Sequence, residues 1–168
     1  GIGLGLSLVV PGYRTVVHVE RELTALANLE KKIEVGSLDR SCIYSDARSF
    51  DGRAWRGKIH LVTAGYPCQP FSLAGKRRGS ADPRHLWPTV KQIVGDVRPP
   101  LVFLENVQGH LSLGFDEVTA GLAEIGYDAT WTTLSAAEVG ASHRRNRLWC
   151  LAYTTNDHRW AGNETVKS

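Results

Sequence analysis

The sequence contains no methionine, only three cysteines and no long apolar run. Cys42, Cys68 and Cys150 are an odd number and form no C-x-x-C pair. This argues against a disulfide framework or a zinc site and favours reduced thiols in a cytosolic setting. No apolar stretch approaches the roughly 20 residues of a membrane-spanning helix. The sequence therefore predicts neither a metal centre nor a membrane partner.

The excess of positive over negative charge is also small. The net charge is only +3, which permits a nucleic-acid partner without requiring one. A hydrophobic content of 42% and a charged content of 22% are typical of a soluble globular protein. The 168 residues suffice for one domain with its own core and are too few for two large domains.

Apolar, β-branched runs alternate with helical patterns along the chain. This alternation predicts an α/β fold with a doubly wound, mostly parallel sheet. Strands are expected at residues 15–19, 43–44, 59–64, 101–104, 127–134 and 148–153, and helices at residues 6–10, 21–32, 86–96 and 115–125. Residues 1–153 would form the domain, and residues 154–168 a polar tail.

The front of the chain is rich in glycine. Gly1, Gly3 and Gly5 predict a tight turn in which the backbone can approach a ligand, since glycine has no Cβ and tolerates positive φ. A strand normally precedes such a turn in nucleotide-binding folds. Because none precedes it and methionine is absent, we expect that Gly1 is not a native start and that the first strand is missing.

Two acidic side chains follow the strands expected at 15–19 and 43–44. Glu20 comes at the spacing from the glycines at which a carboxylate commonly binds a ribose hydroxyl. The alternative is a solvated glutamate that opens the next helix. Asp46 is placed to accept a hydrogen bond from an adenine amino group, and its alternative role is a helix N-cap.

A cysteine lies on a loop between two prolines. The strand expected at 59–64 leads into Pro67, Cys68 and Gln69, at a sheet edge where reactive groups gather in α/β folds. A thiol reacts as its thiolate, which nearby positive charge stabilises. The alternative is a small buried cysteine beside a proline turn.

Basic residues follow this cysteine. Lys76, Arg77 and Arg78 belong to a segment, 74–85, that glycines and a proline mark as a surface loop. Their side chains suit phosphate groups. A plain solvated loop is the alternative.

Charged side chains also lie at the ends of two other expected strands. Glu105 follows the apolar strand expected at 101–104, where a carboxyl group could donate a hydrogen bond or a proton. Arg145 and Arg147 lie two apart, so they share one face of an extended segment and suit a carboxylate, a carbonyl or a phosphate. The alternative for Glu105 is a structural ion pair with an arginine.

Taken in order, these motifs resemble those of the DNA cytosine-5 methyltransferase family, from Gly1 to about Tyr153. The resemblance rests on the glycine-rich front, Pro67-Cys68-Gln69 with Phe71-Ser72, Glu105-Asn106-Val107, and the basic element with Arg145 and Arg147. It implies a Rossmann-like, class I S-adenosylmethionine-dependent methyltransferase fold, incomplete at both ends. It further implies S-adenosylmethionine as the cofactor and double-stranded DNA as the partner, in a bacterial or phage-encoded setting.

The resemblance also implies roles for individual residues. Cys68 would add to C6 of a flipped-out cytosine, Glu105 would bind N3 and the exocyclic amine, and Arg147 would bind O2. Arg145 would order the thiol loop. The cofactor would be bound by Gly1, Gly3, Gly5, Glu20, Asp46 and Pro67. The nucleic acid would be bound by Gln69, Ser72, Lys76, Arg77 and Arg78.

The chain differs from the family pattern in several places. The family's first strand and its usual glycine spacing are missing at the front, and His143 stands where the family usually has glutamine. After Tyr153, we expect neither the target-recognition region nor the C-terminal motifs that complete the cofactor pocket. We therefore expect a catalytic fragment that binds cofactor weakly and that a second chain could complete.

Three alternative functions remain open at this point. The first is methylation of cytosine in tRNA, by the related branch that carries the same cysteine and glutamate. The second is a non-catalytic nucleic-acid-binding fragment. The third, a dinucleotide oxidoreductase built on the glycines, leaves Cys68, Glu105 and Arg147 without a task.

Overall fold

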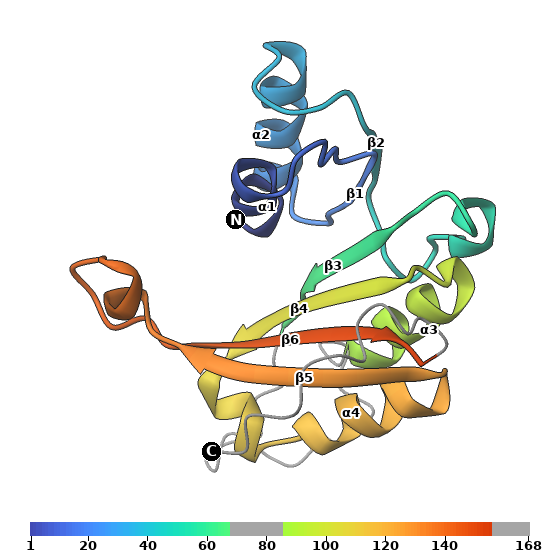
Figure 1. Ribbon diagram of the computed structural model, residues 1–168. Helices are drawn as coiled ribbons and strands as arrows, with labels where there is room; N and C mark the ends of the chain where they lie inside the picture. The colour runs from blue at the N-terminus through green and yellow to red at the C-terminus, as the bar shows by residue number, and fades with distance from the viewer. Residues whose placement is uncertain (68–85, 156–168) are drawn as a thin grey trace. The chain divides into compact units, whose positions relative to one another are not determined.

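The computed structural model describes residues 1–67 and 86–155. The chain divides into two compact units, of which the first spans Gly1–Asp51 and the second begins at Gly52. Each unit contains its own parallel strand pair (Figure 1). Of the tail predicted at 154–168, only residues 154 and 155 are described.

The first unit is a small parallel strand pair with two helices. Its elements are α1 (Ile2–Val9), β1 (Val17–Val19), α2 (Leu23–Glu34) and β2 (Cys42–Tyr44). The ladder runs from Val17 opposite Cys42 to Val19 opposite Tyr44. The carboxyl ends of β1 and β2 therefore lie side by side, where parallel strands gather functional groups.

The tight turn predicted over Gly1, Gly3 and Gly5 is wrong, because α1 begins at Ile2. The amide of Gly5 donates to the carbonyl of Gly1 at 3.1 Å, which is a helical hydrogen bond. Isoleucine and leucine alternate with the glycines, and each glycine costs a helix only about 1 kcal/mol relative to alanine. The predicted end of this helix at Pro11 agrees with the structure.

The second unit carries a four-stranded sheet. Its elements are η1 (Gly52–Trp55), β3 (Leu61–Gly65), α3 (Trp87–Val97), β4 (Leu101–Val107), η3 (Gln108–Ser112), α4 (Phe115–Glu124), β5 (Tyr127–Leu134), η4 (Ala136–Val139) and β6 (Arg147–Thr154). The strand order is β3-β4-β6-β5. β3 and β4 pair in parallel, and β6 is antiparallel to both of its neighbours. β3, β4 and β5 therefore run in one direction.

The α/β class with a mostly parallel sheet is thus confirmed. The reversed direction of β6 follows from its connection to β5. The segment 135–146 holds only the short η4 helix, and strands joined without a crossover helix pair antiparallel. The expected helices and strands agree with the observed ones within a few residues. The largest shift is in α1, which begins at Ile2 instead of residue 6. α2 begins at Leu23 instead of residue 21, because the carboxylate of Glu22 accepts from the amides of Thr24 and Ala25.

One face of the four-stranded sheet forms the core. Alternate residues of β4 and β6 are buried and pack with residues of α3 and α4; the cluster includes Val94, Val102, Leu104, Val118, Leu122, Leu148, Cys150 and Ala152. Since side chains alternate along a strand, Glu105 and Arg147 belong to the opposite face. Within the described residues, no helix is long and apolar enough to cross a membrane.

Candidate active site

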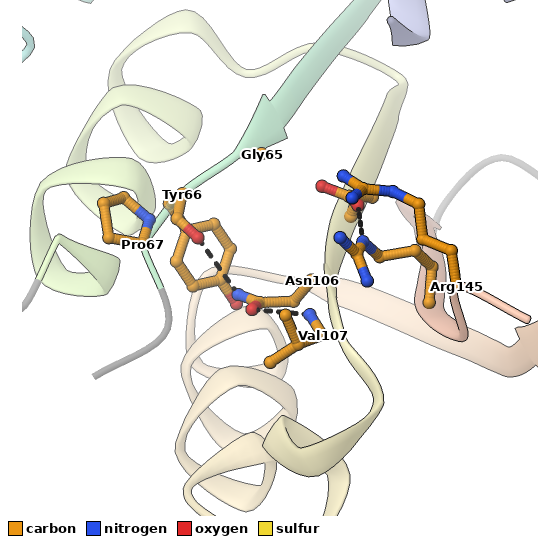
Figure 2. A pocket seen from close by; sticks show the side chains of 8 residues that line it. Gly65, Tyr66, Pro67, Asn106, Val107 and Arg145 are labelled. Atoms are coloured by element: carbon orange, nitrogen blue, oxygen red, sulfur yellow. Dashed lines mark hydrogen bonds and ion pairs between the residues drawn. The ribbon is translucent and has the colours of Figure 1, made fainter. Parts of the chain in front are cut away.

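A pocket of about 330 Å³ opens where β3 and β4 end and β6 begins (Figure 2). Eight residues line it: Gly65, Tyr66, Pro67, Glu105, Asn106, Val107, Arg145 and Arg147. The carboxyl ends of parallel strands are the usual place for ligands in open α/β sheets. The structure therefore brings together Pro67, Glu105, Arg145 and Arg147, which the sequence had placed at separate strand ends.

Glu105 and Arg147 form an ion pair within this pocket. Nε of Arg147 lies 2.7 Å from Oε1 of Glu105, and the two side chains are 20% and 26% exposed, respectively. A guanidinium–carboxylate bond in a partly dry site is stronger than one in open water. Nη1 of Arg147 also donates to the carbonyl of Asn146 at 2.8 Å. The carboxylate is thus held in one orientation, and the structural ion pair kept as an alternative for Glu105 is present.

Gly65 makes room for this carboxylate. It lies opposite Glu105 in the parallel register of β3 and β4. A Cβ atom on residue 65 would lie 3.1 Å from Oε2 of Glu105, closer than an ordinary van der Waals contact. The sequence indicated only that this glycine ends a strand; its second role depends on the register.

Asn106 joins the two strand ends from the buried side. The residue is only 6% exposed. Its Nδ2 donates to the carbonyl of Tyr66 at 3.2 Å, and its Oδ1 accepts from the amide of Val107 at 2.8 Å. Both polar atoms of this buried amide are therefore satisfied, and the backbone before Pro67 is tied to β4.

His110 is a site residue that the sequence did not single out. It lies on η3, is 7% exposed, and its Nε2 is 3.3 Å from the hydroxyl of Tyr66. Its Nδ1 lies 2.9 Å from the carbonyl oxygen of Leu113. A single histidine after a strand has no periodic or spacing signal, so only the folded chain identifies this contact.

The segment that carries the arginines is anchored beside the pocket. Arg145 precedes β6 and is exposed, and Arg147 is the first residue of that strand. Between them, Nδ2 of Asn146 donates to Oε1 of Gln108 at 2.7 Å, which ties this segment to η3. Both arginines line the pocket, as the sequence predicted from their shared face.

In the first unit, Glu20 and Asp46 follow the ends of β1 and β2. The amide of Glu20 donates to the carbonyl of Tyr44 at 3.0 Å, so Glu20 continues the ladder. Its Oε1 accepts from the amides of Arg21 and Glu22, both at 2.8 Å. Oδ1 of Asp46 accepts from the amide of Arg48 at 2.9 Å. The bonds described for each carboxylate involve one oxygen.

The structure agrees only in part with the alternative roles of Glu20, as a residue that opens a helix, and of Asp46, as a helix N-cap. Glu22, not Glu20, caps α2, so Glu20 orders the turn that precedes the helix. Asp46 caps a turn rather than a helix, because residues 47–49 are a turn.

The nucleophile segment lies outside the described residues. This holds for Cys68, Gln69, Ser72, Lys76, Arg77 and Arg78, whose roles stay predictions. Of the cysteines that are described, Cys42 is exposed and Cys150 is buried in the core. Burial raises the pKa of the Cys150 thiol to about 12, so this thiol stays protonated near neutral pH. No cluster of three or more metal-ligating side chains occurs in residues 1–67 and 86–155.

Comparisons with known proteins point to one family. The family model for C-5 cytosine-specific DNA methylase matches residues 1–167. The Type II methyltransferase M.NgoMIV of Neisseria gonorrhoeae is 34% identical over 165 residues, which are 94% of this chain and 51% of that protein. M.CviJI of Paramecium bursaria Chlorella virus IL3A is 36% identical over 114 residues, which are 66% of this chain and 30% of that protein. The chain thus spans about half the length of the first relative and less of the second.

Solved structures agree on the fold. A putative DNA modification methyltransferase encoded within an E. coli prophage matches with a TM-score of 0.70 at 21% identity, over 90% of this chain and 43% of that one. A DNMT2 mutant of Spodoptera frugiperda matches with a TM-score of 0.68 at 20% identity, over 90% of this chain and 46% of that one.

Proposed function

Because the chain belongs to the C-5 cytosine-specific DNA methylase family, we propose that it transfers a methyl group from S-adenosylmethionine to C5 of cytosine in double-stranded DNA. The observation that carries the proposal is the pocket in which Glu105 and Arg147 form an ion pair beside Pro67. Cys68, the proposed nucleophile, follows Pro67 in the sequence. A thiol, a carboxyl group and a guanidinium group are the functional groups that this reaction requires.

The thiol provides covalent catalysis. C5 of cytosine is a poor nucleophile until another nucleophile adds to C6, which makes the ring resemble an enamine. The thiolate of Cys68 forms the C6–S bond, and the C5=C6 electron pair becomes available at C5. Bound S-adenosylmethionine would supply the electrophilic methyl group to C5, with its sulfonium released as a neutral thioether. C5 then loses its proton to a base, the C6–S bond breaks, and the thiolate and the double bond are restored.

Glu105 and Arg147 would bind the ring while this occurs. A carboxyl group at N3 and the exocyclic amine stabilises the charge that enters the ring. The bonds described for Arg147 involve Nε and Nη1, and a guanidinium group has five N–H donors in total. Its other amine can therefore donate to the base carbonyl O2 while Nε still holds Glu105. Arg145, on the same wall, would order the neighbouring loop.

The cytosine must leave the duplex to reach these groups. Side chains at strand ends cannot reach a base inside a stacked helix, so enzymes of this kind flip the nucleotide out. Gln69, Ser72, Lys76, Arg77 and Arg78 would hold the DNA around the flipped base. Since the chain spans about half the length of M.NgoMIV, the proposal includes a second chain or segment that reads the target sequence.

The residues of the first unit fit the proposed cofactor. Glu20 and Asp46 are carboxylates at neighbouring strand ends, and carboxylate oxygens suit ribose hydroxyls and an adenine amine. Gly1 is the N-cap of α1, and Gly5 lies one turn further along the helix. A Cβ at either would meet no atom within 4 Å, and hence the backbone is open to a ligand. The cofactor roles of Gly3, and of Pro67 in the second unit, stay predictions from the family resemblance.

The test combines methyl transfer with covalent trapping. The complete native polypeptide that contains these residues is given radiolabelled S-adenosylmethionine and, separately, duplex DNA or tRNA. Labelling of C5 in DNA, lost in Cys68→Ala, is the expected result. A duplex with 5-fluorocytosine should give a covalent adduct that maps to Cys68, because fluorine blocks the final loss of the C5 proton. Labelling of tRNA but not of DNA would show that tRNA is the substrate. DNA binding without labelling of either nucleic acid would favour a non-catalytic role.

A further inference from the structure

Tyr66 is fixed at three points beside the pocket. Its carbonyl accepts from Nδ2 of Asn106, its hydroxyl lies 3.3 Å from Nε2 of His110, and its ring centroid lies 5.9 Å from that of Trp87. Only 6% of the residue is exposed, although it borders the pocket. In Figure 2 its carbonyl faces the Asn106 amide, next to Pro67. The backbone that enters Pro67 is therefore held by both its main chain and its side chain.

The direction of the Tyr66–His110 bond follows from the second bond of the imidazole. Nδ1 of His110 lies 2.9 Å from the carbonyl oxygen of Leu113, and a carbonyl only accepts. In the neutral ring, the proton is thus on Nδ1, and Nε2 accepts from the Tyr66 hydroxyl. The chain from Tyr66 through His110 to Leu113 has all its polar atoms paired within an otherwise apolar cluster.

Such a polar chain is not needed for burial alone. Phenylalanine at position 66 would bury a similar ring without a hydroxyl that requires a partner. A hydrogen bond is directional, whereas apolar packing leaves a ring free to shift within its cavity. The Tyr66–His110 bond therefore fixes the orientation of the Tyr66 side chain, beyond what its burial requires, just after β3 ends at the pocket.

We propose that Tyr66 and His110 form a positioning pair that sets the end of β3, and hence Pro67, for methyl transfer in the pocket. The inference rests on the proposed function and deepens it. Neither residue touches the reacting atoms. The pair acts through the backbone at Pro67 and does not itself bind the substrate. Its loss should lower the rate of the chemical step more than substrate binding.

The chain offers a matched control at the far end of the same sheet. Tyr127 is 1% exposed, and its hydroxyl donates to the carbonyl of Pro99 at 2.6 Å. It pairs with Thr154 at the end of β6 that is opposite to Arg147. Tyr127→Phe and Tyr66→Phe thus remove the same buried hydroxyl from two places, and only one of these places borders the pocket.

The experiment measures methyl transfer and thermal unfolding of the complete native polypeptide. The variants are Tyr66→Phe, Tyr127→Phe, His110→Leu and the double variant Tyr66→Phe/His110→Leu. Tyr66→Phe should lower kcat roughly tenfold with little change in KM for DNA or S-adenosylmethionine, because positioning affects the transition state. Tyr127→Phe should lower Tm by a few degrees and leave kcat unchanged.

The double variant separates positioning from stability. His110→Leu removes the imidazole that lies 3.3 Å from the buried Tyr66 hydroxyl, so its Tm should fall the furthest. Removing that hydroxyl as well should recover much of the Tm, whereas kcat should stay low. Recovery of kcat together with Tm, or an equal loss of kcat in Tyr66→Phe and Tyr127→Phe, would overturn the inference. A wild-type protein that transfers no methyl group would instead refute the proposed function, and with it this inference.

Discussion

Gly65 and Glu105 lie directly opposite each other in the parallel ladder of β3 and β4, with Oε2 of Glu105 only 3.1 Å from the position that a Cβ of residue 65 would occupy. The site therefore depends on the absence of a Cβ atom at Gly65 as much as on the Glu105 carboxylate. The atom that a new Cβ would meet is at the end of a flexible side chain, so the backbone need not move and the carboxylate would move instead.

Gly65→Ala should therefore impair activity without unfolding the protein. The methyl group pushes the Glu105 carboxylate from its place beside Arg147, and we expect kcat to fall about tenfold with a Tm change of only a degree or two. Steady-state methyl transfer and thermal unfolding test this. Gly95→Ala, in α3, is the control, since its Cβ would meet only Ile125 Cγ2 at 4.0 Å. Equal activity of the two variants would contradict the proposed role of Gly65.

Glu105→Gln should abolish most of the activity. The amide keeps the shape of the side chain, but it loses the negative charge that pairs with Arg147 and the acid that would donate to N3. We expect kcat to fall about a hundredfold, which is the scale of a lost general acid or base. Glu124→Gln is the matched control, because Glu124 pairs with Lys91 and neither residue lines the pocket. A Glu105→Gln enzyme with wild-type kcat would leave the ion pair as a structural feature only.

Glu20→Ala should weaken S-adenosylmethionine binding about tenfold, the cost of one hydrogen bond to a charged acceptor. Glu20 also orders the turn before α2, so some stability should be lost. Glu22→Ala controls for that loss, because Glu22 caps α2 through the amides of Thr24 and Ala25. Its removal should lower the stability of the helix start and leave the Kd unchanged. Isothermal titration calorimetry gives both dissociation constants. The same Kd for both variants would exclude Glu20 from the cofactor site.

Stability should fall in alkali through the buried Cys150. Burial raises the pKa of its thiol from 9.0 to about 12. As pH rises, the thiol therefore ionises in the unfolded state before it does in the folded state, and the stability that it contributes is fully present only below about pH 9. As pH rises from 9 towards 12, each unit should cost up to about 1.4 kcal/mol of unfolding free energy. Burial likewise raises the pKa of Tyr127 to about 12, which adds the same trend above pH 10.

Urea unfolding between pH 8 and 11, repeated on two variants, measures this dependence. Cys150→Ala should show a shallower pH slope than the wild type, since one of the two buried acids is gone. Cys42→Ala is the control, because that thiol is exposed and its removal should leave the slope unchanged. A wild-type slope in Cys150→Ala would mean that another group is responsible.

Most of the fold could be predicted from the sequence. Continuous apolar runs such as 101–104 and the alternation in 127–134 encode strands locally, because burial on one or both faces sets the residue pattern. The glycine-rich front was misjudged for a local reason as well. Glycine permits a turn, but the apolar residues Ile2 and Leu4 between the glycines are compatible with the helix that forms.

The site was predictable only in part. Glu105, Arg145 and Arg147 could be assigned to strand ends because parallel strands expose their last residues at one edge. Which oxygen meets which nitrogen depends on register and side-chain packing. Two residues show what the sequence could not predict. His110 contacts Tyr66 and Leu113, and Asn106 contacts Tyr66 and Val107, and these contacts form only in the folded chain.

The sequence by itself determined the alternation of strands and helices, the family, and the residue types at each strand end, because these depend on local pattern and on motifs read along the chain. Only the tertiary structure decided that Gly65 faces Glu105, that Arg147 holds this carboxylate, and that the Tyr66 hydroxyl lies within hydrogen-bond distance of His110. These contacts join residues about 40 positions apart in the chain, and no local pattern encodes a pairing at that separation. The register of β3, β4 and β6 sets the first two contacts, and the η3 turn that follows β4 brings His110 to Tyr66.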